Sequence, residues 1–249
     1  DHRDLHSFPT RRSSDLDLPE KIEDTVMAQL TGEQRKLYLA NQDRIAQQVQ
    51  HREANEFKKD KLKVLAELTK LRQICCDPRL HYEDYKAGSA KLDTCMELVH
   101  GALDGGHRIL LFSQFTGMLD IIGKRLAKED IAFLKLTGAS SKESRAKMVA
   151  QFQAGEVPVF LISLKAGGVG LNLTAADVVI HYDPWWNVAA QDQATDRAHR
   201  IGQQHTVTVY KLIAKDTIEE RIMQMQESKR DLVNSVLGGD GISSALFTR

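Results

Sequence analysis

Two arginines near residue 200 have the spacing of a phosphate-binding group. The segment QATDRAHRIGQ, residues 193–203, places Arg197 and Arg200 three positions apart, with Gln193 four before Arg197. On a helix these side chains share one face. A planar guanidinium matches the oxygens of a transferring phosphoryl group. Taken alone, the pattern is more typical of a surface helix whose arginines pair with the nearby acids Asp192 and Asp196.

A glycine-rich segment precedes this group in the chain. In SLKAGGVGLNL, residues 163–173, Gly168 and Gly170 belong to a run of three glycines in four positions, and Ser163 and Lys165 stand just before it. Glycines let the backbone approach a ligand closely or adopt positive φ. Neither GxxxxGK[ST] nor GxGxxG is present. The segment is either a ligand-binding loop or a tight turn after a strand.

Polar residues also follow two apolar runs. Ser113 and Gln114 come directly after the run 108–112, where they can donate to phosphate oxygens or cap the next helix. His181 and Asp183 follow the run at 178–180, and with Ser163 they suggest a hydrolytic triad. No GxSxG accompanies them, so polar residues at strand ends are the better interpretation.

Strands and helices alternate in the part of the chain that carries these residues. Alternation of this kind predicts an α/β fold, a parallel β-sheet with helices on both faces. We expect function at the carboxyl ends of its strands. The predicted strands are 108–112, 131–136, 157–163, 178–182 and 206–213, and the predicted helices are 116–128, 142–153, 191–201 and 217–237.

The region from Asp17 to about Tyr85 is predicted to be helical. Thr31 and Gln34 have the spacing of a capping box at the start of one helix. A second helix is predicted from Phe57 to Ile74, with apolar residues three and four apart.

Composition narrows the class of protein. The chain has 249 residues, 42% hydrophobic and 27% charged, which excludes a disordered or collagen-like chain. No apolar run is long enough to span a membrane. The three cysteines lack zinc-ligand spacing, so we expect buried thiols in a reducing compartment and no metal site. The net charge is zero, but residues 124–147 carry seven basic residues against three acids.

The first sixteen residues form a separate segment. DHRDLHSFPTRRSSDL resembles the in-frame translation of a common short-read sequencing adapter and lacks the apolar core of a signal peptide. We expect residues 1–16 to be an artefact of a gene truncated at a contig edge, with the natural protein continuing N-terminally.

The motifs, taken in order, resemble a known family. FSQF, LKLTG followed by Arg145, SLKAGGVGLNL, DPWWN and QATDRAHRIGQ closely resemble the second RecA-like lobe of the Swi/Snf-type ATPases in helicase superfamily two. The resemblance runs from roughly Leu68 to Leu237. It implies a RecA-like sheet, an N-terminal helical segment (17–87) that links to a missing first lobe, the lobe itself (88–214), and a C-terminal brace helix with a clipped tail (215–249).

The resemblance also implies roles for individual residues. Arg197 and Arg200 match the arginines that reach the nucleotide phosphates, and Gln193 leads the same motif. Gly168 and Gly170 match the loop that couples nucleotide to DNA. The remaining implied residues are contacts to the DNA backbone or lie near it: Ser113, Gln114, Ser163, Lys165 and Trp185, with Trp186 beside the last. Core packing is an equally good interpretation of the two tryptophans.

The resemblance implies that the chain is one of the two lobes of an ATP-driven motor. The expected whole protein is a bacterial, cytoplasmic ATP hydrolase that translocates on double-stranded DNA or remodels a protein–DNA complex, with ATP bound between two lobes and Mg²⁺ held by the missing first lobe. The chain alone is expected to be inactive. Two alternatives are a non-catalytic nucleic-acid or partner-binding module and a strand-separating helicase of the same superfamily. Walker A and DEAH-type motifs upstream of Asp17 would favour the motor.

Overall fold

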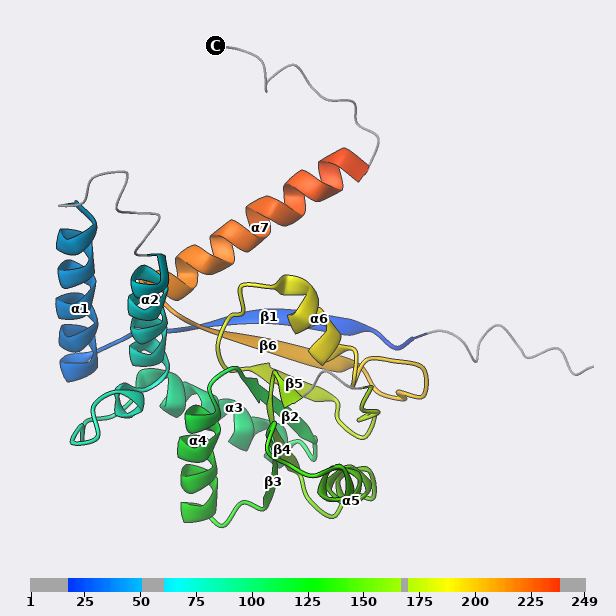
Figure 1. The fold of residues 1–249 in the computed structure, drawn as a ribbon. Coiled ribbons are helices and arrows are strands. Elements are labelled where there is room, and N and C mark those ends of the chain that lie inside the picture. Colours follow the sequence, from blue (N-terminus) through cyan, green and yellow to red (C-terminus); the bar gives the residue numbers. More distant parts are fainter. Residues whose placement is uncertain (1–17, 51–60, 167–169, 238–249) are drawn as a thin grey trace, which may run out of the picture.

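The fold is a parallel sheet with helices on both faces, as the alternation predicted (Figure 1). The computed structural model describes residues 18–50, 61–166 and 170–237. Within them six strands form one all-parallel sheet in the order β1-β6-β5-β2-β4-β3. The strands are β1 (Lys21–Ala28), β2 (Ile109–Ser113), β3 (Phe133–Leu136), β4 (Val159–Ser163), β5 (Val178–His181) and β6 (Val207–Ala214).

Helices cover both faces of this sheet. They are α1 (Gly32–Gln50), α2 (Lys61–Cys76), α3 (Ala90–Asp104), α4 (Thr116–Lys128), α5 (Lys142–Gln153), α6 (Val188–Thr195) and α7 (Ile218–Leu237), with a short 3₁₀ turn at Pro78–Leu80. The predicted bounds of α4 and α5 are confirmed to the residue.

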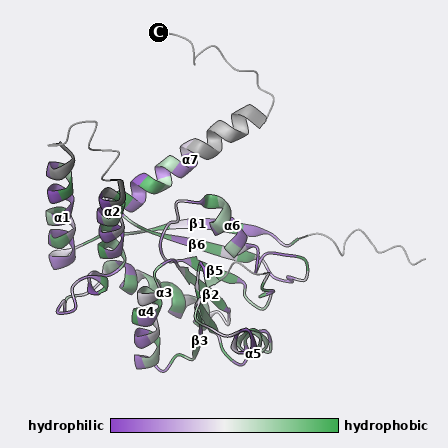
Figure 2. Ribbon diagram, viewed as in Figure 1, coloured by the Kyte–Doolittle hydropathy of each residue, from purple (hydrophilic) through white to green (hydrophobic). Residues whose placement is uncertain are grey.

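Alternate residues of the central strands build two separate cores, since successive side chains of a strand point to opposite faces. Leu111 and Leu161 pack with α3 and α4 on one face. Leu110 and Phe160 pack with α5 and α6 on the other. Both faces are apolar, so β2 and β4 are hydrophobic up to the serine that ends each strand (Figure 2). Helices α4 and α5 alternate polar and apolar stripes in the same view.

The N-terminal region differs from the helical prediction. Lys21–Ala28 is not helical but forms edge strand β1, paired in parallel with β6 along its full length. Most of its side chains are exposed, so the apolar alternation of a half-buried strand is weak. Its conformation is set by hydrogen bonds to β6, far away in the sequence.

Helices α1 and α2 pack beside the sheet and form a third core cluster with the base of α7. The predicted capping box at Thr31 and Gln34 is wrong. The Gln34 amide instead donates to the Ile74 carbonyl at 3.0 Å and accepts from the Ala90 backbone N–H at 3.0 Å. Gln34 therefore joins α1 to the end of α2 and the start of α3.

Helix α7 begins against this cluster and projects away from the sheet (Figure 1). The backbone N–H of Ile218 donates to the Tyr38 hydroxyl at 2.8 Å. No helix within the described ranges has the length and apolar character needed to cross a membrane. The predictions for residues 1–16, Phe57, Gly168 and the C-terminal tail from 238 fall outside the described residues.

Candidate functional site

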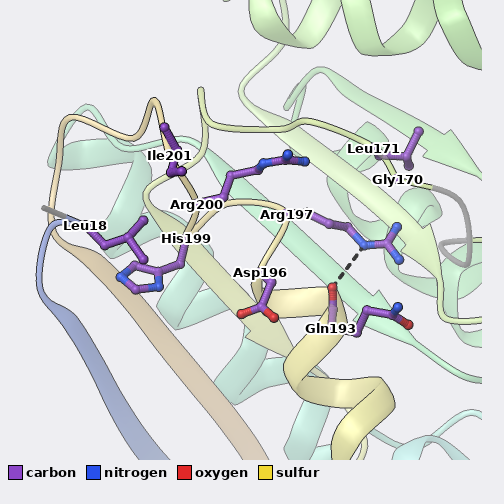
Figure 3. A pocket seen from close by; sticks show the side chains of 9 residues that line it. All are labelled: Leu18, Gly170, Leu171, Gln193, Asp196, Arg197, His199, Arg200 and Ile201. Atoms are coloured by element: carbon purple, nitrogen blue, oxygen red, sulfur yellow. Dashed lines mark hydrogen bonds between the residues drawn. The ribbon is translucent and has the colours of Figure 1, made fainter. Parts of the chain in front are cut away.

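A pocket of about 480 Å³ brings together most of the residues predicted to meet a nucleotide (Figure 3). Gln193 reaches it from α6, Arg197 and Arg200 from the turn that follows α6, and Gly170 from the segment between β4 and β5. The full lining is Leu18, Gly170, Leu171, Gln193, Asp196, Arg197, His199, Arg200 and Ile201. Gly170 of the glycine-rich segment thus lines the same pocket as the two arginines.

Arg197 is buried with an unused donor. The residue is 7% exposed, and its Nε donates to the Gln193 carbonyl at 3.5 Å. Its Nη1 is buried and meets no hydrogen-bond acceptor within the described part of the chain. Burial and the nearby charge of Arg145 both lower the pKa of Arg197. A buried guanidinium without a carboxylate partner costs free energy, which an anionic ligand would recover.

Arg200 supplies the exposed cation of the same pocket. Its guanidinium and that of Arg197 extend from the turn toward the side on which Gly170 and Leu171 lie (Figure 3). The Leu173 backbone N–H donates to the Arg197 carbonyl at 3.0 Å and ties the two segments together. One buried and one exposed arginine at a shared pocket can hold a multiply charged anion such as a phosphate.

The local structure of this group differs from the predicted short helix at 191–201. Helix α6 ends at Thr195, so Arg197 and Arg200 lie in a turn and not on a helix face. The turn leads to β6, which must start at the opposite edge of the sheet because all strands are parallel. The arginines therefore lie beside α6 and are not at the carboxyl ends of the strands, where we expected function to gather.

The carboxyl ends of the strands hold the polar residues predicted to contact DNA. Ser113 and Ser163 are register partners at the ends of β2 and β4, and both are buried. The Ser113 hydroxyl and the Gln114 amide donate to Asp183, and the Ser163 hydroxyl accepts from the Ala166 N–H at 3.3 Å. Lys165 is exposed directly after this pair. The Ser113 and Ser163 side chains thus cap the turns at this edge.

The two tryptophans have different environments. Trp185 is half-buried and packs against the core under α6, and its backbone N–H donates to Gln191 at 3.4 Å. Trp186 is 45% exposed. Trp186 therefore presents the more accessible ring at this edge.

At the strand ends the structure gives Asp183 a role that the sequence did not assign, and it adds one residue, Arg72, that sequence reasoning missed. Asp183 is the common acceptor for Ser113 and Gln114, and buried Arg72 reaches the same place from α2. The run of polar residues at three neighbouring strand ends was a usable signal for Asp183. Arg72 gave no local signal, because it lies on a helix far away in the sequence.

The hydrolytic triad is not formed. His181 stacks on Phe112 with ring centroids 5.6 Å apart, and its Nε2 bonds to the Thr195 hydroxyl at 2.9 Å. Burial, together with the charge of Lys211, lowers the pKa of His181 to about 3, so the ring is neutral. Asp183 is engaged with Ser113 and Gln114, which leaves no relay through His181.

The donor set of the pocket fits a phosphate and not a metal ion. Its charged donors are guanidinium groups, which repel cations and bind phosphoryl oxygens. Within the described ranges no group of three or more His, Cys, Asp or Glu side chains could hold a metal ion. The buried thiols Cys75, Cys76 and Cys95 confirm the predicted packing role of the cysteines, and burial raises the pKa of each.

Together, the sheet and the pocket define an α/β lobe with two arginines gathered in a pocket beside α6. Comparison with known proteins narrows the class. Residues 90–202 match the family described as the helicase conserved C-terminal domain. A protein of Mycoplasma pneumoniae described as an uncharacterized ATP-dependent helicase is 40% identical over 225 residues, which are 90% of this chain and 21% of that protein.

Two solved structures from Sulfolobus solfataricus share the fold. The SWI2/SNF2 ATPase C-terminal domain superposes with a TM-score of 0.71 at 35% identity, covering 85% of this chain and 87% of that one. The SWI2/SNF2 ATPase core in complex with dsDNA gives a TM-score of 0.75 at 37% identity, covering 89% of this chain and 47% of that one. The chain belongs to the C-terminal RecA-like lobes of the Swi2/Snf2-type ATPases in helicase superfamily two. The chain spans about a fifth of the Mycoplasma relative.

Proposed function

We propose that this lobe is the second half of an ATP-dependent motor that translocates on double-stranded DNA or remodels a protein–DNA complex. The observation that carries the proposal is the buried Arg197, whose Nη1 has no acceptor among the described residues and lies in a pocket shared with Arg200, Gln193 and Gly170. Such a donor is explained by an anionic substrate that arrives from outside the chain. The triphosphate of ATP, bound between this lobe and a first lobe, has the required charge.

In this proposal Arg197 and Arg200 are arginine fingers. They stabilise the negative charge that develops on the γ-phosphate in the transition state, which is worth about 10³-fold or more in rate. Gln193 and Gly170 line the nucleotide side of the same pocket. The family resemblance assigns Gly168 the same role. Mg²⁺, held by the first lobe, supplies further neutralisation of the phosphates. The chain alone has half of the site, so it turns over no ATP by itself.

The strand-end residues form the proposed DNA side. Lys165 is an exposed cation there, and Gln114 and Trp185 are half-buried neighbours. Ser113 and Ser163 are buried, so we assign them to holding the turns that approach the backbone. The proposal is supported by the likeness to a Swi2/Snf2-type core whose structure was solved with dsDNA. Contacts of this kind are made mostly to phosphates and tolerate any sequence.

The remaining parts of the proposal concern the whole protein. Its partners are double-stranded DNA and the first lobe of the same polypeptide, and its setting is the cytoplasm of a bacterium. Closure of the two lobes around ATP would shift the DNA-backbone contacts of one lobe relative to those of the other.

The test compares Arg197→Ala with Arg125→Ala in the full-length protein that contains this lobe. Arg125 pairs with Glu129 on α4, across the sheet from the pocket, and is the matched control. We expect Arg197→Ala to lower DNA-stimulated kcat by about 10³-fold while duplex affinity stays unchanged. Full turnover by Arg197→Ala would contradict the finger role. Turnover by the purified 249-residue chain, above that of its own Arg197→Ala variant, would contradict the shared site.

A further inference from the structure

The turn Asp183–Trp186 follows β5 and is held by groups from other parts of the fold. The Asp183 carboxylate accepts from the Ser113 hydroxyl and from the backbone and side chain of Gln114, at the end of β2. The Trp185 carbonyl accepts a hydrogen bond from Gln226 of α7. The turn is thus fixed by the neighbouring strand and by the brace helix.

Arg72 joins this turn to helix α2. Its Nη2 donates to the Pro184 carbonyl and lies 4.0 Å from Asp183 Oδ2, while its Nη1 donates to Gln114 Oε1 at 3.1 Å. Arg72 is 2% exposed. One planar guanidinium therefore bridges the turns after β2 and β5 from a helix that lies outside the sheet.

The same guanidinium lies close to two aromatic rings. Its central carbon lies 5.4 Å from the centroid of the Trp186 ring and 5.7 Å from that of Phe115. A guanidinium can stack on rings through its faces and donate hydrogen bonds in its plane at the same time. A lysine ammonium is compact and cannot do both. The exposed ring of Trp186 thus rests on a buried arginine.

We propose that Arg72 is a positioning residue for the nucleic-acid side of this lobe, setting the Asp183–Trp186 turn and the Trp186 ring. The inference rests on the proposed function, because it assumes that the strand-end edge contacts DNA. Arg72 is buried and does not touch DNA itself. It acts through Gln114, Pro184 and Trp186, and it links the placement of that edge to the N-terminal helix α2.

The test uses the 249-residue chain with Trp185→Phe, which leaves Trp186 as the only tryptophan of the two. Arg72→Gln and Arg72→Lys are compared in this parent, with Arg44→Gln as the control. Arg44 also bridges to a neighbouring helix, at Glu67 of α2, but on the exposed surface. The first readout is the emission maximum and acrylamide quenching of Trp186 without DNA. The second is the affinity for a labelled duplex, measured by anisotropy.

Both Arg72 variants should shift the Trp186 emission to longer wavelength, increase its quenching and weaken duplex binding by about fivefold. The Arg44 variant should match the parent in both readouts. If Arg72→Gln loses its cooperative unfolding transition, Phe115→Leu replaces it. That variant keeps the Arg72 charge but removes one of the two rings close to the guanidinium. We expect the same shift in Trp186 emission and quenching and the same loss of duplex affinity.

The outcomes separate the two proposals. A parent that binds duplex while the Arg72 variants keep its emission and affinity overturns the positioning role. If Arg72→Lys alone keeps both the emission and the affinity, the positioning role is also overturned. A positive charge without the planar guanidinium would then be enough to hold the turn. The unsubstituted 249-residue chain, which keeps Trp185, is titrated with the same duplex, and its failure to bind contradicts the proposed DNA contact of this edge, whatever the Trp186 signal shows.

Discussion

Lys91 and Glu219 form an ion pair that is completely buried. The Lys91 Nζ lies 3.0 and 2.8 Å from the two carboxylate oxygens of Glu219, and neither side chain is exposed. Burial lowers the pKa of Lys91, but the Glu219 carboxylate outweighs this effect and raises it above its usual value. Glu219 also accepts from the Ala214 backbone N–H at 2.9 Å. The pair fixes the first turn of α7 to α3 and to the end of β6.

Breaking this pair should cost much stability. Lys91→Met leaves a buried carboxylate without its counter-charge, so we expect the free energy of unfolding to fall by about 3–5 kcal/mol. Adding Glu219→Leu should recover part of that loss. The exposed pair Lys135–Asp120 is the control, and Lys135→Met should cost about 1 kcal/mol or less. Urea unfolding measures all three variants. An equal, small effect at both pairs would contradict the prediction.

The side chain of Gln34 should stabilise the packing of α1 against α2 and α3. Gln34→Leu is close in size but leaves the Ala90 N–H and the Ile74 carbonyl without their side-chain partner. We expect a loss of about 1–3 kcal/mol in the free energy of unfolding. Gln47→Leu, at an exposed position of the same helix, should change it little. If the two variants unfold at the same urea concentration, the Gln34 bridge has no energetic role.

His181 should make the lobe acid-sensitive. Its pKa is about 3 in the folded state, against an ordinary value of 6.5. Between these values the unfolded chain binds a proton that the folded chain does not. Stability is therefore lost as pH falls below about 6.5, with a slope of up to about 1.4 kcal/mol per pH unit from this group.

The measurement is urea unfolding between pH 7 and pH 5 for the wild type and His181→Gln. We expect the stability difference between them to shrink as the pH falls, because only the wild type carries the buried imidazole. His205→Gln, at an exposed position, should keep the slope of the wild type. Parallel stability curves for wild type and His181→Gln would contradict the prediction.

Lys165 should contribute one phosphate contact to duplex binding. Lys165→Gln is expected to reduce the slope of log affinity against log salt by about one, with a similar effect on any duplex sequence. Lys128→Gln is the matched control, since Lys128 is exposed at the end of α4 and away from the strand ends. Anisotropy titrations across a salt series give both slopes. A change that depends on duplex sequence would point instead to a contact with base edges.

Much of the fold could be predicted because its signals are local. The apolar runs of β2 and β4 are buried on both faces, the amphipathic spacing of α4 marks that helix, and the Ser141 side chain caps the start of α5. Strands that alternate with helices imply parallel pairing whatever the detailed packing. The motif residues Gln193, Arg197 and Arg200 were likewise visible as a group.

Other features depended on partners distant in the sequence. Strand β1 is exposed along most of its length and is held in place by β6. Gln34 has the spacing of a capping residue, yet its amide is drawn to the ends of α2 and α3. No window around Arg72 indicates that its guanidinium reaches the turn after β5.

The sequence by itself determined the α/β class, the strand and helix pattern after residue 88 and the set of motif residues, because hydrophobic periodicity and short-range spacing act along the chain. Only the tertiary structure decided that Arg197 is buried with an Nη1 that meets no acceptor among the described residues, that Asp183 gathers Ser113 and Gln114, and that Arg72 lies beside the Trp186 ring. These properties arise from desolvation and from hydrogen bonds between segments that meet only when the sheet has formed.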